Sequence, residues 1–169
     1  MNLSERVYAA FLFSVALWCL AIVAAPVLHA IDYGESRWIA DVLYLGFAKI
    51  CHQIDGRSLH VFGDKFGVCI RCTAIYWSFL AGLVVYPFAR SLQSNILPNR
   101  LWLIVGIAPM VIDAFLNDSA IHQSGELSRL VTGSIGGFVF AFYILPLFIE
   151  ALKQLIVHRT IQGDSRYAG

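Results

Sequence analysis

Charged residues are scarce in this sequence. Asp, Glu, Lys and Arg make up 14% of its 169 residues, whereas hydrophobic residues make up 59%. Because a soluble domain carries about 25% charged residues, this composition excludes an ordinary soluble protein. The mean hydropathy is +0.70, and long apolar runs account for the excess. The sequence therefore predicts a polytopic membrane protein whose surroundings are a lipid bilayer.

Other features are also missing. The formal net charge is only +1, so nothing indicates a nucleic acid as a partner. No internal repeat is visible, and we expect one membrane domain over residues 1–169. Four cysteines are too few for a disulfide scaffold. Three of them nevertheless lie between residues 51 and 72, which is too close for accident.

The apolar runs predict an all-α, integral membrane four-helix bundle. The first run follows Arg6 and is long enough to cross a hydrocarbon core of about 30 Å. It is longer than the core of a usual signal peptide and no clean cleavage site follows it, so we expect an uncut first helix. The four predicted spans are residues 7–31, 69–89, 101–117 and 127–151.

Between the first and second spans the chain is expected to stay at the membrane surface. Residues 38–50 have helical apolar spacing but are too few to cross a bilayer, which predicts a short interfacial helix. Residues 60–68 are typical of a small hairpin, with turn residues from Gly63 to Lys65. This Cys/His-bearing loop returns the chain to Cys69-Ile70-Arg71-Cys72 at the start of the second span.

The candidate metal ligands lie in this loop. Cys51, His52, Cys69 and Cys72 form a Cys3His set, which is a ligand set that zinc accepts. Cys51 and His52 are adjacent, which makes joint ligation awkward, and His60 is an alternative nitrogen ligand. A c-type haem is disfavoured because no histidine follows Cys72. Our leading hypothesis is a zinc site that serves a small membrane enzyme or carrier.

A second chemistry is open to the same cysteines. A Cys-x-x-Cys at a helix start has a thiolate stabilised by the helix N-terminus and by Arg71. With four spans, this is similar to membrane disulfide–quinone oxidoreductases, which use two cysteine pairs. Here Cys51 has only Cys19 left as a partner, at a different depth. A third hypothesis is a non-catalytic accessory subunit of a larger membrane complex, and the sequence does not decide whether the protein is an enzyme.

Further residues are candidates for binding a ligand such as a lipid or a quinone. Asp113 and Arg129 flank the turn between the third and fourth spans, and we expect them to form a salt bridge. Arg129 can also hold a phosphate or carboxylate together with other arginines. Tyr76 falls on the same helical stripe as Cys72. The candidate ligand-binding residues are Arg57, His60, Arg71, Tyr76, Asp113 and Arg129.

We infer the orientation of the protein in the membrane from the placement of its Lys and Arg residues. Four spans put both termini on one side, and six of the 12 Lys/Arg residues lie on each side, so their count alone is a tie. Half of the cations on the side of the cysteines are candidate site residues rather than topology anchors. We therefore expect the termini in the cytoplasm and the cysteine loop on the outer face of the cell (inner) membrane.

These motifs together resemble a bacterial and archaeal family of membrane proteins known as domain of unknown function 2085. The resemblance covers residues 48–137 and implies a small multi-pass membrane protein. It supports the choice of site residues but implies no activity. The motifs that carry it are Cys51-His52-Gln53, Arg57-Ser58, Cys69-Ile70-Arg71-Cys72, Tyr76, Asp113 and Arg129-x-x-Thr132-Gly133.

Overall fold

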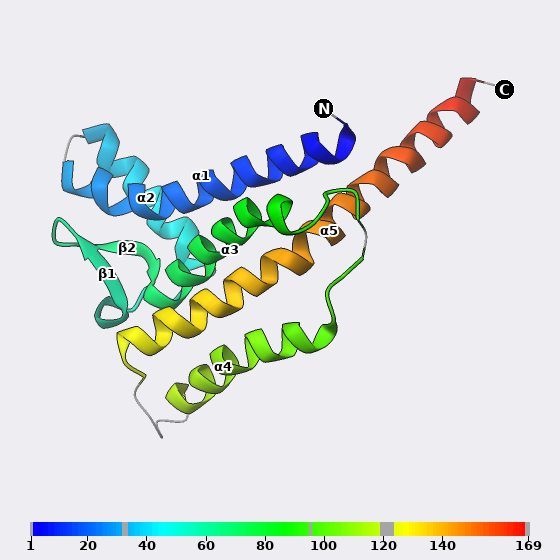
Figure 1. Ribbon diagram of the computed structural model, residues 1–169. Helices are drawn as coiled ribbons and strands as arrows, with labels where there is room; N and C mark the ends of the chain where they lie inside the picture. The colour runs from blue at the N-terminus through cyan, green and yellow to red at the C-terminus, as the bar shows by residue number, and fades with distance from the viewer. Residues whose placement is uncertain (1, 32–33, 95, 119–123, 168–169) are drawn as a thin grey trace.

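The protein is an elongated helical bundle with a small hairpin at one end (Figure 1). The structure is a computed structural model, and it describes residues 2–31, 34–94, 96–118 and 124–167. Its elements in these ranges are α1 (Leu3–Ile31), α2 (Gly34–Ala48), a 3₁₀ turn (Asp55–Arg57), β1 (Ser58–Val61), β2 (Asp64–Cys69), α3 (Ile70–Ala89), α4 (Arg100–Asp118) and α5 (Glu126–Tyr167).

Four helices in the described part of the chain are long and apolar enough to cross a membrane. They are Leu3–Ile31, Ile70–Ala89, Arg100–Asn117 and Glu126–Ile156. Large side chains on them are widely exposed; Phe88, for example, is 88% exposed and Phe13 64%. Such surfaces face lipid tails without the free-energy cost that water would impose. The predicted all-α membrane bundle of four spans is confirmed.

Among the helix boundaries that differ from the predicted ranges, two have a clear physical reason. α5 continues to Tyr167, far beyond residue 151, because the end of an apolar run marks the edge of the hydrocarbon and not the end of the backbone helix. α2 begins at Gly34 rather than at residue 38, with Glu35 in its first turn, where a carboxylate favours the helix N-terminus. The turn expected between the third and fourth spans falls largely on residues 119–123, outside the described residues.

α3 and α5 pack closely through glycines of α5. A Cβ atom on Gly133 would lie 2.9 Å from the carbonyl oxygen of Arg71, and one on Gly137 would collide with the carbonyl oxygen of Ile75. Small residues four apart let two helix backbones touch. The contact holds the first turn of α3, which carries Arg71 and Cys72, directly against the start of α5.

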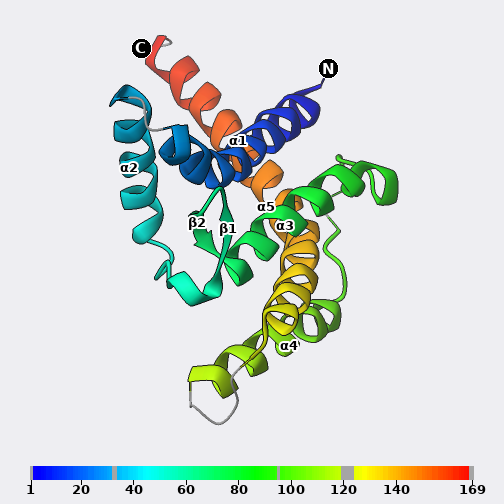
Figure 2. The ribbon, with the colours of Figure 1, turned by 90° about the vertical axis from the view of Figure 1, so that its left-hand side faces the viewer.

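α1 packs antiparallel to α3 and then continues past it. The Tyr8 hydroxyl donates a hydrogen bond to the carbonyl oxygen of Leu83 at 3.0 Å, and the Cys19 thiol donates to that of Tyr76 at 3.5 Å. Near its end α1 contacts the hairpin instead, where His29 Nδ1 lies 2.9 Å from an oxygen of Asp64. Figure 2 shows α2 and the two strands gathered around this end of α1.

The hairpin and α2 cover the end of the bundle. Val61 pairs with Asp64, so Phe62 and Gly63 form the turn, and both have positive φ as a type I′ turn requires. The predicted hairpin is confirmed, with its turn beginning one residue earlier than expected.

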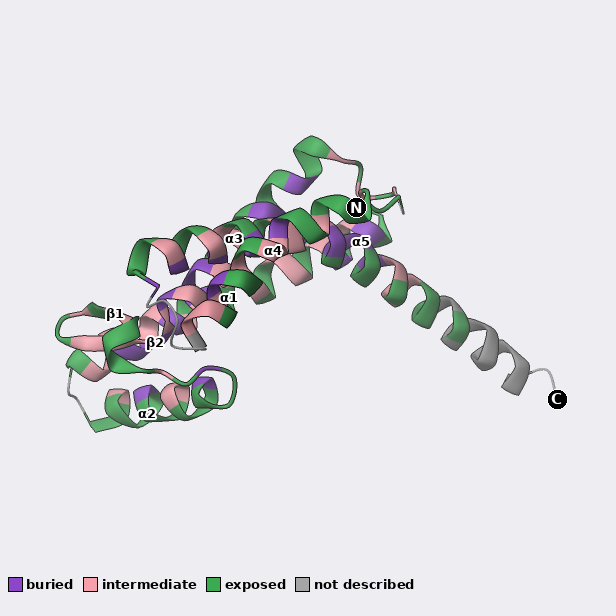
Figure 3. Cartoon of the chain, turned by 90° about the horizontal axis from the view of Figure 1, so that it is seen from below, coloured by how far each residue is buried: buried purple, intermediate pink, exposed green. Residues whose placement is uncertain are grey.

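The outer surface of α2 is largely exposed (Figure 3), and it includes Trp38 and Leu45, which is consistent with an interfacial helix.

Candidate functional site

Three cysteines meet where α2, β2 and α3 come together. Cys51 follows α2, Cys69 ends β2, and Cys72 lies in the first turn of α3. Their sulfur atoms all lie within 4.8 Å of one another. Cys51 is buried, Cys69 and Cys72 are half-buried, and all three are free thiols. The sulfur ligands predicted from the sequence are therefore brought together.

The position of Cys51 depends on a close contact behind it. Its backbone N–H donates to the carbonyl oxygen of Phe47 at 3.0 Å, and its sulfur accepts the backbone N–H of Cys69 at 3.2 Å. The Phe47 ring lies against Gly67, where an added Cβ would be 2.6 Å from Cδ2 of the ring. A glycine at position 67 thus lets α2 approach β2 closely enough for the sulfurs to meet.

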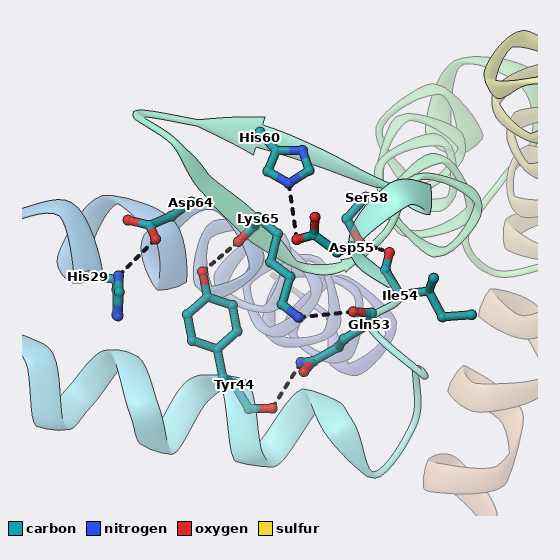
Figure 4. A network of polar contacts seen from close by, with 9 residues as sticks. All are labelled: His29, Tyr44, Gln53, Ile54, Asp55, Ser58, His60, Asp64 and Lys65. Atoms are coloured by element: carbon teal, nitrogen blue, oxygen red, sulfur yellow. Dashed lines mark hydrogen bonds and ion pairs between the residues drawn. The ribbon is translucent and has the colours of Figure 1, made fainter.

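Gln53 fixes the loop that follows Cys51 (Figure 4). Its side-chain amide donates to the carbonyl oxygens of Tyr44 at 2.9 Å and Gly67 at 2.7 Å. Lys65 Nζ donates to the carbonyl oxygen of Gln53 at 3.1 Å. The loop backbone is strained there, since Gln53 has a φ of 48°. Sequence reasoning missed this role, and the only signal was the presence of Gln53 in the Cys-His-Gln motif.

Tyr44 holds the hairpin from α2. Its hydroxyl donates to the carbonyl oxygen of Lys65. Burial and, to a smaller extent, the negative charge of Asp64 together raise the pKa of Tyr44 to about 12. The hydroxyl therefore keeps its proton across the physiological range and remains a donor.

Cys69 is the thiol whose surroundings most favour the charged form. Its pKa is lowered to about 5, above all because the Cys72 thiol donates a hydrogen bond to its sulfur. The backbone N–H groups of Cys72 and Arg71 act in the same direction, while burial opposes them. The thiolate is the form that binds metals and attacks disulfides, so both chemistries considered for this site are open to Cys69.

The two candidate histidine ligands are placed differently from the thiols. His52 is exposed and lines the cavity described below, but it is not part of the group whose ligand atoms lie within 4.8 Å of one another. His60 also lies outside that group, and its Nε2 is 3.3 Å from Oδ1 of Asp55 on the exposed side of the hairpin (Figure 4). To complete a metal site, either histidine would have to move.

A cavity of about 200 Å³ lies beside the three sulfurs. Three of the sequence-predicted ligand-binding residues line it together: Arg57 from the 3₁₀ turn, Arg71 from α3 and Arg129 from α5. Asn117 of α4, which sequence reasoning did not single out, lines it as well. The cavity thus combines three thiols with three guanidinium groups.

Asp113 pairs with Arg71 and not with Arg129. Arg71 Nη2 donates to Asp113 Oδ2, and the Ser128 hydroxyl donates to Oδ1 at 2.6 Å. Arg129 Nη2 donates instead to the amide oxygen of Asn117 at 3.2 Å. The predicted salt bridge between Asp113 and Arg129 was wrong, because the close approach of α3 brings Arg71 to the carboxylate, a tertiary contact that sequence spacing does not reveal.

Tyr76 and Cys19 lie about one helical turn further into the bundle than the three clustered thiols. Tyr76 follows Cys72 by one helical turn, and its ring centroid is 5.8 Å from that of Trp18. Cys19 is fully buried in α1, bonds to the carbonyl oxygen of Tyr76, and is not part of the sulfur group. Cys51 and Cys19 therefore do not form the second cysteine pair that a disulfide–quinone oxidoreductase would need.

Comparisons with known proteins agree with the membrane architecture. Residues 51–143 match the family described as "Predicted membrane protein (DUF2085)", a segment that begins at Cys51 and includes α3 and α4. A relative in Methanocaldococcus jannaschii, the uncharacterized protein MJ1492, is 35% identical over 152 residues, covering 89% of this chain and 97% of the relative. No solved structure matches the chain significantly.

Proposed function

The chain belongs to the DUF2085 family of predicted membrane proteins, and we propose that it is a multi-pass protein of the cell membrane that binds a zinc ion at the membrane surface. The ligands in this proposal are the thiolates of Cys51, Cys69 and Cys72. The observation that carries it is the convergence of three sulfurs from α2, β2 and α3 within 4.8 Å of one another.

The donor set fits zinc better than the other common metals. Thiolates favour soft or borderline ions, whereas magnesium and calcium take oxygen ligands. Zinc–sulfur bonds of about 2.3 Å place tetrahedral sulfurs roughly 3.8 Å apart. Sulfurs within 4.8 Å of one another reach that spacing through small side-chain shifts.

Cys51, Cys69 and Cys72 all line the cavity, so a metal held by the three sulfurs would have room there for a ligand at its fourth coordination position. His52 lines the cavity and fills this position if its side chain swings toward the sulfurs. If His52 stays where it is, the position is left to water or to a substrate. Three protein ligands with one open position are typical of catalytic zinc sites, whereas structural sites are closed by four protein ligands. An open position supports a small membrane enzyme or carrier rather than a purely structural metal.

The proposal also includes the orientation predicted from the sequence. Arg57, Arg71 and Arg129 make the number of Lys and Arg residues equal on the two sides of the membrane. All three line one cavity, which supports the interpretation that they are site residues rather than topology anchors. The termini then lie in the cytoplasm, and the thiols lie on the outer face of the cell (inner) membrane. Zinc binding would keep these thiols reduced on that more oxidising side.

Metal content and thiol state test the zinc proposal. The purified protein is expected to contain one zinc per chain and four reduced cysteines. Cys51→Ser, Cys69→Ser and Cys72→Ser should each lose the metal, because each removes a ligand. Cys19→Ser is the matched control and should retain it, since Cys19 lies outside the sulfur group.

Two other outcomes would replace the proposal. A metal-free protein with a Cys69–Cys72 or Cys51–Cys69 disulfide would favour a thiol–disulfide oxidoreductase, with a quinone as the electron acceptor. The chain could also hold a metal, show no activity by itself, and co-purify with a membrane complex. If removal of the metal then abolished the activity of that complex, a non-catalytic accessory subunit would be favoured.

A further inference from the structure

We propose that the arginine-lined cavity and an apolar groove below it bind one ligand, a lipid that carries a phosphate monoester. The phosphate lies among Arg57, Arg71 and Arg129, and the hydrocarbon chain lies in a groove between α1, α3 and α5. This inference goes beyond the zinc proposal and does not depend on it, because the residues that hold the lipid are not the metal ligands.

The first step is the charge of the cavity. Arg57, Arg71 and Arg129 line it, and the carboxylate that the structure pairs with them is Asp113, bound to Arg71. These four side chains leave two positive charges. Three thiolates around a zinc ion carry one net negative charge, so at least one positive charge remains even with the metal bound. The cavity is therefore suited to an anion.

The second step is the state of the buried arginines. Arg129 is only 8% exposed, and the partner the structure gives it is the neutral amide of Asn117. Arg71 Nε is fully buried and has no hydrogen-bond partner among the described residues. Buried guanidinium groups are costly unless they are paired. A phosphate provides charge and several strong acceptors in one small group.

The third step is the groove. It has a volume of about 360 Å³ and an entirely apolar lining. Because it lies among three membrane-spanning helices, its surroundings are hydrocarbon and its occupant is an apolar chain. Its lining includes Val15, Trp18, Tyr76, Phe79, Phe140 and Ile144.

The fourth step joins the two spaces. On α3, Arg71 and Cys72 line the cavity, whereas Ile75, Tyr76 and Phe79 line the groove. Residues three or four apart share a helix face, and one turn rises about 5.4 Å. The polar and apolar spaces therefore follow each other down a single face of α3. A molecule with an anionic head and a hydrocarbon chain fills both, whereas a neutral quinone head would leave the net positive charge of the cavity unbalanced.

Binding of three probes to the purified protein in detergent tests the proposal. They are dioctanoyl phosphatidic acid, dioctanoyl phosphatidylcholine and inorganic phosphate, each titrated while its dissociation constant is measured. We expect phosphatidic acid to bind at least tenfold more tightly than either of the others. The phosphatidylcholine has the same chains without the net charge, and phosphate has the charge without the chains.

Variants then assign the two parts of the site. Arg129→Gln and Arg57→Gln should each weaken phosphatidic acid binding at least tenfold. Arg57 is exposed, so its replacement leaves the fold intact if the buried Arg129 variant fails to fold. Val15→Trp should fill the groove and weaken lipid binding but not phosphate binding. Arg100→Gln, at the exposed start of α4 and outside the linings of both the cavity and the groove, is the matched control and should change nothing.

Three results would overturn the proposal. Equal affinity for phosphatidylcholine would mean that the groove accepts any lipid chain. Equal affinity for inorganic phosphate would mean a site for the free ion, with no role for the groove. Wild-type affinity in both Arg57→Gln and Arg129→Gln would separate the lipid from the cavity. Each can be found with zinc present or absent, so none of them bears on the metal proposal.

Discussion

At the scale of single residues, Arg71 joins the thiol cluster to the rest of the bundle. It lies between Cys69 and Cys72 in the sequence and lines the cavity. Its guanidinium group forms a salt bridge with Asp113 on α4. Asp113 is 9% exposed, so its carboxylate has little water to replace a lost cation. A salt bridge in this position fixes the arrangement of α3 and α4 around the cavity.

We expect this pair to be energetically coupled. Arg71→Gln or Asp113→Asn alone leaves one buried charge without its partner and should lower the free energy of unfolding by about 3–5 kcal/mol. The double variant should lose clearly less than the sum of the two, which a double-mutant cycle of thermal unfolding in detergent measures.

The comparison cycle uses Arg129→Gln with Asp113→Asn. Its coupling should be weaker, because Arg129 bonds to Asn117 instead. Strictly additive losses for Arg71 and Asp113, or a larger coupling for Arg129 and Asp113, would contradict the pairing.

At the scale of the elements, the contact between α3 and α5 determines where the site forms. Gly137→Ala should lower the free energy of unfolding by about 1–3 kcal/mol, since its Cβ would collide with backbone of α3. Gly136→Ala is a matched control on the next residue. Its Cβ would meet the flexible side chain of Met110 at 3.3 Å, so we expect no loss. Thermal unfolding of both variants measures the difference, and equal stabilities would show that α3 and α5 tolerate separation.

Most elements could be predicted because their signals are local. The spans follow from apolar runs, the hairpin from its turn residues, and the small-residue face of α5 from the spacing of Gly133 and Gly137. The closeness of Cys69 and Cys72 could be predicted for the same reason, since their Cys-x-x-Cys motif opens a helix. The partner of Asp113 could not, because Arg71 is 42 residues away and only the close packing of α3 on α5 brings it near.

Other features were hidden for different reasons. Gln53 holds the loop through hydrogen bonds to backbone carbonyl groups, and backbone acceptors leave no pattern in a sequence. The continuation of α5 beyond the predicted span could not be foreseen, because hydropathy measures contact with lipid and not helix propensity. The position of His52 depends on how the chain leaves α2, which sequence spacing does not determine.

At the scale of the whole molecule, the orientation in the membrane decides which compartment the cavity faces. A green fluorescent protein fused after Gly169 should fluoresce, and alkaline phosphatase inserted near Gly63 should be active, because the first requires the cytoplasm and the second the outer side. Gly63 lies in the exposed turn between β1 and β2, where insertions are tolerated. The same two reporters exchanged between the positions should both be silent. The reverse pattern would contradict the proposed orientation and place the thiols in a reducing compartment.

The unequal lengths of α1 and α3 have a consequence for the bilayer itself. α1 has 29 residues and α3 has 20, a difference of about 14 Å in helix length. No single hydrocarbon thickness matches both, and the excess of α1 is enclosed by α2 and the hairpin, which replace lipid around it. Because α3 begins at Ile70, next to these side chains, we expect the thiols and arginines to lie at the level where the bilayer gives way to water. Longer acyl chains should raise that boundary past them, so we expect the lipid composition of the membrane to determine how much water reaches the cavity.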